Sequence, residues 1–207
     1  MMKKHIPSLA AAEQMLTEAE KKNPGPWVQH ARYAAQAAGL IAARHPDLDE
    51  TTARCLGLLH DIGRREGVSD MRHVLDGYNY LVGLGYPDAA RICLTHSFPL
   101  KQVEAASGEW DCTPDELAFI RAYLAEIDYD LYDRLIQLCD ALALPTGFCL
   151  IEKRLVDVAL RRGVNALTVE KWKGFLALQK EFELGVGGSI YALLPGVVVN
   201  TFGSNIG

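Results

Sequence analysis

The stretch from Leu58 to Gly63, Leu-Leu-His-Asp-Ile-Gly, places a histidine and an aspartate side by side directly after an apolar run. A helix predicted over residues 50–65 is apolar nearly all round, so we expect it at the centre of a helical domain, with Gly63 ending or bending it. A buried carboxylate or imidazole is costly unless it is paired or bound to a metal. His60 and Asp61 therefore need partners from elsewhere in the chain.

The rest of the sequence predicts further helices and almost no strand. Helical spacing of apolar residues, N-cap residues such as Thr113 and Thr168, and Pro or Gly breaks support these assignments. The expected helices cover residues 8–22, 27–44, 73–84, 88–95, 113–126, 128–144, 149–162 and 168–184. Between two of them, residues 97–111 are predicted to form a long irregular connection or lid with at most one short helix.

The predicted fold is all-α, a bundle of roughly eight to ten helices that forms a single domain over residues 1–207. Its metal-binding core would span residues 27–145, and the C-terminal helices and tail would follow. In the tail, residues 189–194 are expected to make one helical turn. Residues 197–199, which are all valine, are expected to be a short extended piece.

Composition narrows the possible partners. The 207 residues are 49% hydrophobic and 23% charged, which is typical of a globular protein with a sizeable core. The 21 basic against 26 acidic residues give a net charge of −5, and no basic stripe is evident, so binding to long nucleic acids is not expected. A small phosphorylated substrate remains compatible, because a metal site can supply positive charge locally.

The N-terminal sequence and the cysteines favour a cytoplasmic protein without membrane association. Glu13 and Gln14 interrupt the apolar residues that a signal peptide would need, and no apolar run is long enough to span a bilayer. The cysteine count is odd and no CxxC motif occurs, so we expect small buried hydrophobes in a reducing compartment. These cysteines are Cys55, Cys93, Cys112, Cys139 and Cys149. A homodimer is compatible with the apolar helices.

Four further residues could partner the His-Asp pair. Asp140 lies within an apolar run of a predicted helix, where aspartate is unusual, although a structural salt bridge is an alternative. Each histidine alone could equally be a packed core or surface residue. Together, imidazole and carboxylate suit divalent Mn, Fe, Co, Ni or Zn, and the lack of nearby sulfur argues against a structural zinc cluster. The candidate metal ligands are His30, His60, Asp61, His73, His96 and Asp140.

In order and spacing, His30, His60-Asp61 and Asp140 resemble the H…HD…D pattern of the HD-domain superfamily of metal-dependent phosphohydrolases. The resemblance covers residues 27 to 145. It implies an all-α fold and metal ligation by these four residues.

Two further histidines resemble those of the superfamily members that bind two metals. They are His73, in His-Val-Leu-Asp-Gly, and His96, in Thr-His-Ser. The resemblance then implies that Asp61 bridges the ions, so one or two ions are expected per chain. Ser97 stands where some members have a second histidine, and Gly85-Tyr86-Pro87 lies outside the context of the family's Gly-Tyr-Pro signature.

The resemblance and the residues together predict a metal-dependent phosphohydrolase that attacks phosphorus with metal-activated hydroxide. The expected substrate is a small phosphorylated metabolite, with a nucleotide or dinucleotide favoured. Asp61 is the candidate catalytic residue, and Arg64 could bind a phosphate oxygen or simply lie at a solvated helix end. Lys101 is a weaker substrate-binding candidate. The alternatives are an HD-type di-iron oxygenase and a non-catalytic signalling module.

Overall fold

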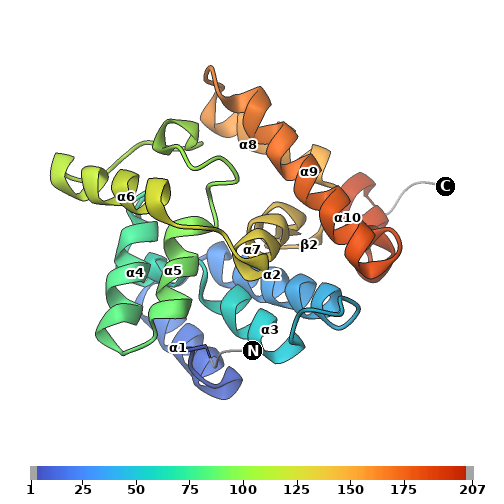
Figure 1. Ribbon diagram of the computed structural model, residues 1–207, viewed down its shortest axis with the longest axis horizontal. Helices are drawn as coiled ribbons and strands as arrows, with labels where there is room; N and C mark the ends of the chain where they lie inside the picture. Colours follow the sequence, from blue (N-terminus) through green and yellow to red (C-terminus); the bar gives the residue numbers. More distant parts are fainter. Residues whose placement is uncertain (1–3, 204–207) are drawn as a thin grey trace.

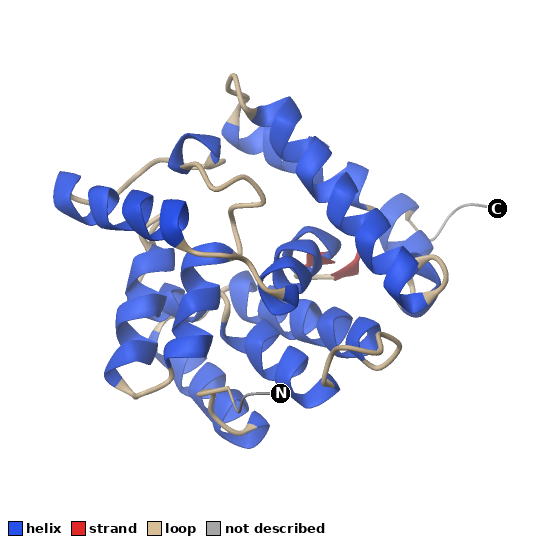
Figure 2. Cartoon of the chain, in the orientation of Figure 1, coloured by secondary structure: helices blue, strands red, loops and turns tan. Residues whose placement is uncertain are grey.

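The computed structural model describes residues 4–203, which fold into α-helices joined mostly by short connections (Figures 1 and 2). The α-helices are α1 (Leu9–Lys22), α2 (Pro26–Ala42), α3 (Glu50–Leu59), α4 (His73–Gly83), α5 (Pro87–Thr95), α6 (Pro114–Glu126), α7 (Leu131–Leu142), α8 (Ile151–Arg162), α9 (Thr168–Val186) and α10 (Val197–Phe202). Three 3₁₀-helices, η1 (Ile62–Glu66), η2 (Val103–Ala105) and η3 (Ile190–Leu193), and the strands β1 (Ala143–Leu144) and β2 (Gly147–Phe148) complete the described part. The predicted all-α class is confirmed.

Several local expectations need correction. The central helix is shorter than predicted, because α3 ends at Leu59 and the chain continues as the 3₁₀-helix η1. The extended piece expected at residues 197–199 is wrong: these valines begin α10, which follows the left-handed Gly196 (φ 74°). Thr168 is the first residue of α9 rather than its N-cap, and its hydroxyl accepts a hydrogen bond from the backbone N–H of Asn165 at 2.8 Å.

Close packing of α2 against α3 brings the first two ligand-bearing segments together. The inner face of α2 carries several buried alanines, and Gly57 of α3 lies directly against them. A Cβ atom on Gly57 would lie 2.5 Å from Cα of Ala35, so only glycine permits this approach. Backbone contact of this kind places His30 of α2 opposite His60 at the end of α3.

Helix α7 joins the two sides of the molecule. It contacts α2, α3 and α5 on one side and α8 and α9 on the other, and it lies near the centre of the view in Figure 1. Asp130 caps its first turn by accepting hydrogen bonds from the backbone of Tyr132 and Asp133 at 2.8 and 3.1 Å. The central position of α7 explains why Asp140, near its C-terminal end, can reach the middle of the bundle.

The α8–α9 pair is tied to the long connection at residues 97–111, which contains one short helix, η2, in agreement with the prediction of at most one. Asn165, between α8 and α9, donates from Nδ2 to the carbonyl oxygens of Glu104 and Ala106 at 3.1 and 3.3 Å. Arg162 pairs with Asp70 at 2.9 Å. These bonds hold α8 and α9 above the centre of the bundle and thereby enclose a cavity.

Among the described residues, every helix is too short or too polar to cross a lipid bilayer. All five cysteines are free thiols, and Cys112 alone among them is partly exposed. The expectation of buried cysteines is confirmed for Cys55, Cys93, Cys139 and Cys149 and not for Cys112.

Candidate metal centre

The six predicted ligands lie on different elements, and most lie at element ends. His60 is the C-cap of α3 and His96 is the C-cap of α5, while His73 is the first residue of α4. The three others are His30 in α2, Asp61 just before η1 and Asp140 in α7. Helix ends converge on the centre of the bundle, and the structure brings all six residues together there.

The first cluster contains His30, His60 and Asp140. Nε2 of His30 lies 3.3 Å from Nε2 of His60 and 2.9 Å from Oδ1 of Asp140. Nε2 of His60 lies 4.0 Å from the same carboxylate oxygen. One ligand atom each from His30, His60 and Asp61 also lies within 4.8 Å of the others, so Asp61 joins this cluster.

The second cluster contains His73 and His96, again with Asp61. Nε2 of His73 lies 3.2 Å from Oδ1 of Asp61, and Nε2 of His96 lies 3.6 Å from the same oxygen. All three side chains are buried. Asp61 is therefore the one residue common to both clusters, which is the position that a bridging ligand would occupy.

All four histidines are oriented by the backbone. Nδ1 of His30 donates to the carbonyl of Ala143 at 3.1 Å, and Nδ1 of His60 donates to that of Gly57 at 2.7 Å. Nδ1 of His73 donates to the carbonyl of Asp70, and Nδ1 of His96 lies 3.0 Å from that of Cys93. Such bonds fix the tautomer and leave each Nε2 directed inward as a ligand atom.

This donor set fits a cation. With Nδ1 protonated, each neutral imidazole presents an Nε2 lone pair toward other lone pairs and carboxylate oxygens. Positive charge, from a proton or a metal ion, must then lie between them. Ligands about 2.1 Å from one ion lie about 3.0–3.4 Å from each other, which is close to the spacings within the two clusters. Imidazole and carboxylate favour a divalent first-row metal over Mg²⁺ or Ca²⁺.

Burial and local charge set the protonation of these groups. Burial lowers the pKa of His96 to about 3, and it also lowers the pKa of His60, so both imidazoles are neutral at pH 7. Burial alone would raise the pKa of the Asp61 carboxyl, but Arg64 and His73 hold that pKa well below its usual value. Burial likewise opposes ionisation of Asp140, while the hydrogen-bond contact with His30 lowers the pKa of the Asp140 carboxyl. Ionised carboxylates and neutral imidazoles are the forms that bind metals.

Arg64 lies at the edge of the second cluster. Its Nε donates to Oδ2 of Asp61 at 2.8 Å, and Nη2 lies 3.5 Å from Nε2 of His73. The guanidinium therefore orients Asp61, whose other oxygen faces the histidines. Arg64 also lines the cavity, so part of its guanidinium group faces the space above the clusters. Lys101 is not among the lining residues; it donates to the carbonyl of Ile127 and lies 3.7 Å from Asp128.

The cavity has a volume of about 840 Å³ and extends from the two clusters to α8 and α9. Its wall carries Trp27, Trp172 and Phe175 as well as the cations Arg154 and Lys171. Neither cation was among the residues predicted from the sequence. A signal for Lys171 exists, because it continues the spacing of the buried residues of α9, which are Lys171, Phe175, Leu178 and Phe182.

The fold and the site together define a class of protein: a helical protein in which two histidine clusters share one carboxylate. The family model described as HD domain matches residues 27–144, which is more than half of the chain. The chain therefore belongs to the HD-domain family, a superfamily of metal-dependent phosphohydrolases that bind divalent metals. No curated protein and no solved structure matches the chain.

Proposed function

We propose that this protein is a metal-dependent phosphohydrolase that acts on a small phosphorylated metabolite, with a nucleotide or dinucleotide as the favoured substrate. The observation that carries the proposal is the position of Asp61 within reach of both His30 and His60 on one side and His73 and His96 on the other. This arrangement could hold two divalent ions, and Asp61 would then be a ligand to both. Asp140, beside His30 and His60, would supply a second carboxylate to an ion held at the first cluster.

The roles of the protein groups follow from their contacts. A divalent ion held by these residues would lower the pKa of a bound water, so that hydroxide would be available near neutral pH. Asp61 aligns the nucleophile through its central position, and Arg64 holds Asp61 by the 2.8 Å bond from Nε. The remaining N–H groups of Arg64 can donate to a phosphoryl oxygen as negative charge builds during attack on phosphorus.

The cavity supports a small substrate. Its volume of about 840 Å³ lies within the usual range for small-molecule sites, about 300–1,000 Å³. The aromatic side chains of Trp27 and Trp172 offer flat apolar surfaces against which a nucleobase can pack.

A substrate panel tests this proposal. The protein is loaded separately with Mn, Fe, Co, Ni or Zn and assayed for phosphate or nucleotide release from nucleotides and dinucleotides. Hydrolysis should disappear on chelation, return on adding metal, and be abolished in His60→Ala and Asp61→Ala. His5→Ala is the matched control, since the His5 side chain is 77% exposed and outside the cavity.

Two results would contradict the proposal. One is hydrolysis that survives unchanged in both ligand variants. The other is oxygen consumption by the iron-loaded protein with no phosphate release from any substrate, which would identify an oxygenase on the same ligand set.

A further inference from the structure

Lys171 is a buried cation in the cavity wall. The residue is 8% exposed, it lies in the first turn of α9, and it lines the cavity above the metal clusters. Its Nζ donates to Oγ of Ser107 at 3.0 Å. Within residues 4–203, no carboxylate oxygen lies within 4.0 Å of this nitrogen. An ammonium has three N–H donors, so the bond to Ser107 leaves two that can donate to a bound ligand.

The other cations at the outer end of the cavity differ from Lys171, because carboxylates neutralise them. Arg162 pairs with Asp70 at 2.9 Å, and Arg161 pairs with Asp157 at 3.0 Å. Arg154 is intermediate: its Nη1 lies 3.7 Å from the carboxylate of Asp157, which Arg161 already holds. Lys171 and Arg154 therefore leave positive charge available inside the cavity.

These two cations influence each other and the metal centre. Burial has the largest effect and lowers the pKa of Lys171 to about 8. The carboxylate of Asp140 raises this pKa, whereas the charge of Arg154 lowers it. At neutral pH the ammonium is charged in an environment that penalises the charge. An anionic ligand between Lys171 and Arg154 would remove this penalty.

The position of Lys171 separates it from the metal ligands. Neither Asp61 nor Asp140 lies within ion-pair distance of its Nζ. The cation that pairs with Asp61 is Arg64. The ammonium is instead held at Ser107, in the connection that faces α9. An anionic group bound beside Lys171 would therefore have different protein donors from a phosphoryl group bound beside Arg64 and the two clusters.

We propose that Lys171 and Arg154 form a second anion subsite, which binds a phosphate or carboxylate group of the ligand other than the one held at the metal centre. The substrate class is then a compound with two separated anionic groups. The identity of the compound that is turned over rests on the proposed function, but the subsite itself does not depend on turnover.

Phosphonates test the subsite without hydrolysis, because their P–C bonds resist phosphohydrolases. Metal-loaded protein, freed of excess metal, is titrated calorimetrically with methylphosphonate and with bisphosphonates that have one, two or three carbons between the phosphorus atoms. At least one bisphosphonate should bind about tenfold or more tightly than methylphosphonate, as expected for added charge-assisted hydrogen bonds. In Lys171→Met this advantage should disappear while methylphosphonate binding stays unchanged.

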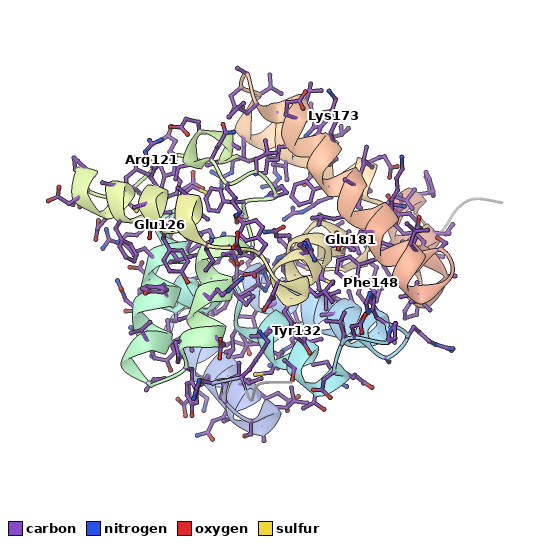
Figure 3. The ribbon with its side chains drawn as sticks, viewed as in Figure 1. Arg121, Glu126, Tyr132, Phe148, Lys173 and Glu181 are labelled. Atoms are coloured by element: carbon purple, nitrogen blue, oxygen red, sulfur yellow. The ribbon has the colours of Figure 1, made fainter. Side chains whose placement is uncertain are left out.

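Lys173→Met is the matched control and should behave as the wild type. Lys173 lies on the same helix, its side chain is 67% exposed and paired with Glu170, and Figure 3 shows it at the outer edge of the molecule. Arg154→Gln provides a second test if Lys171→Met folds poorly, and it should reduce the same advantage. A role limited to holding Ser107 predicts a lower melting temperature for Lys171→Met, whereas an anion subsite predicts an equal or higher one.

The subsite is overturned if no bisphosphonate binds more tightly than methylphosphonate, or if Lys171→Met weakens both ligands equally. These outcomes are separate from the fate of the proposed function. If the protein prefers bisphosphonates but hydrolyses no substrate, the anion subsite is supported and the proposed hydrolase function is contradicted. If it hydrolyses substrates without preferring bisphosphonates, the hydrolase function is supported and the subsite is contradicted.

Discussion

Gly63 lies directly against the backbone of His73: a Cβ atom on Gly63 would lie 2.0 Å from the carbonyl oxygen of His73 and 2.4 Å from the amide nitrogen of Gly77. Gly77 in turn leaves room for Cys93, whose Sγ would lie 2.9 Å from a Cβ on Gly77. The two glycines therefore let the segment after Asp61 pack onto α4. This packing places His73 beside Asp61.

Gly63→Ala should unfold more easily and lose metal from the second cluster. The added methyl group meets backbone atoms that cannot rotate away, so we expect a loss of about 3 kcal/mol in the free energy of unfolding. Gly83→Ala, at the open end of α4, should change stability by less than about 1 kcal/mol. Urea unfolding of both variants checks this, and equal stabilities would refute the proposed backbone contact.

Metal content should distinguish the two clusters. If Asp61 bridges two ions, His96→Ala should reduce the content from about two ions per chain to about one, because the first cluster keeps His30, His60 and Asp140. Asp61→Ala should lower occupancy of both clusters. Elemental analysis after gel filtration gives the counts. A wild-type content of about one ion, unchanged in His96→Ala, would assign a single-metal centre to the first cluster.

Acid should destabilise the metal-free protein below pH 6.5. The pKa of His96 is about 3 in the folded protein against 6.5 for a free imidazole. Between these values the unfolded chain binds a proton that the folded chain does not, so stability falls as pH decreases, by about 1 kcal/mol per pH unit. His96→Gln should remove this contribution. Chelated wild type and variant are compared by urea unfolding from pH 7 to pH 5, and parallel curves would contradict the assignment.

Arg91→Met should be strongly destabilising. Asp133 is fully buried, and its carboxylate accepts hydrogen bonds from Nε of Arg91 at 3.0 Å and from Oγ1 of Thr95 at 2.7 Å. Removing the guanidinium leaves a buried charge without its main partner, which costs about 3–5 kcal/mol. His96 follows Thr95 directly, so metal binding at the second cluster should weaken as well.

Arg121→Met is the control for this ion pair. Arg121 pairs with Glu104 on the surface, and both side chains are about half exposed. Its loss should cost less than about 1 kcal/mol. Thermal unfolding of the two variants should therefore differ clearly, and a similar small effect in both would show that Asp133 tolerates the loss of its partner.

The sequence predicted the helices and indicated the candidate ligands because both leave local patterns in it. Apolar spacing and caps such as Thr113 define the helices, and an aspartate inside an apolar run draws attention to Asp140. The end of α3 at Leu59 was less predictable, since the tertiary contact between Gly63 and α4 favours a 3₁₀ turn there. The valines of α10 have extended propensity, but packing of Val197 in the core and contacts with β2 favour a helix.

The cavity wall could not be predicted from local patterns. Lys171 is noticeable only as a charged residue on the buried face of a helix, and its partner Ser107 is far away in the sequence. Which residues face the clusters depends on how α8 and α9 lie over them. That arrangement depends on long-range bonds such as the one from Asn165 to Ala106.

The cavity is built from two separate stretches of the chain. All six candidate ligands lie within residues 27–144, whereas Arg154 and Lys171 lie in helices beyond that match. Natural selection can therefore change what the cavity accepts by mutating α8 and α9 while the ligands stay constant. Directed-evolution libraries confined to residues 151–175 should yield variants with new ligand preferences and unaltered metal content.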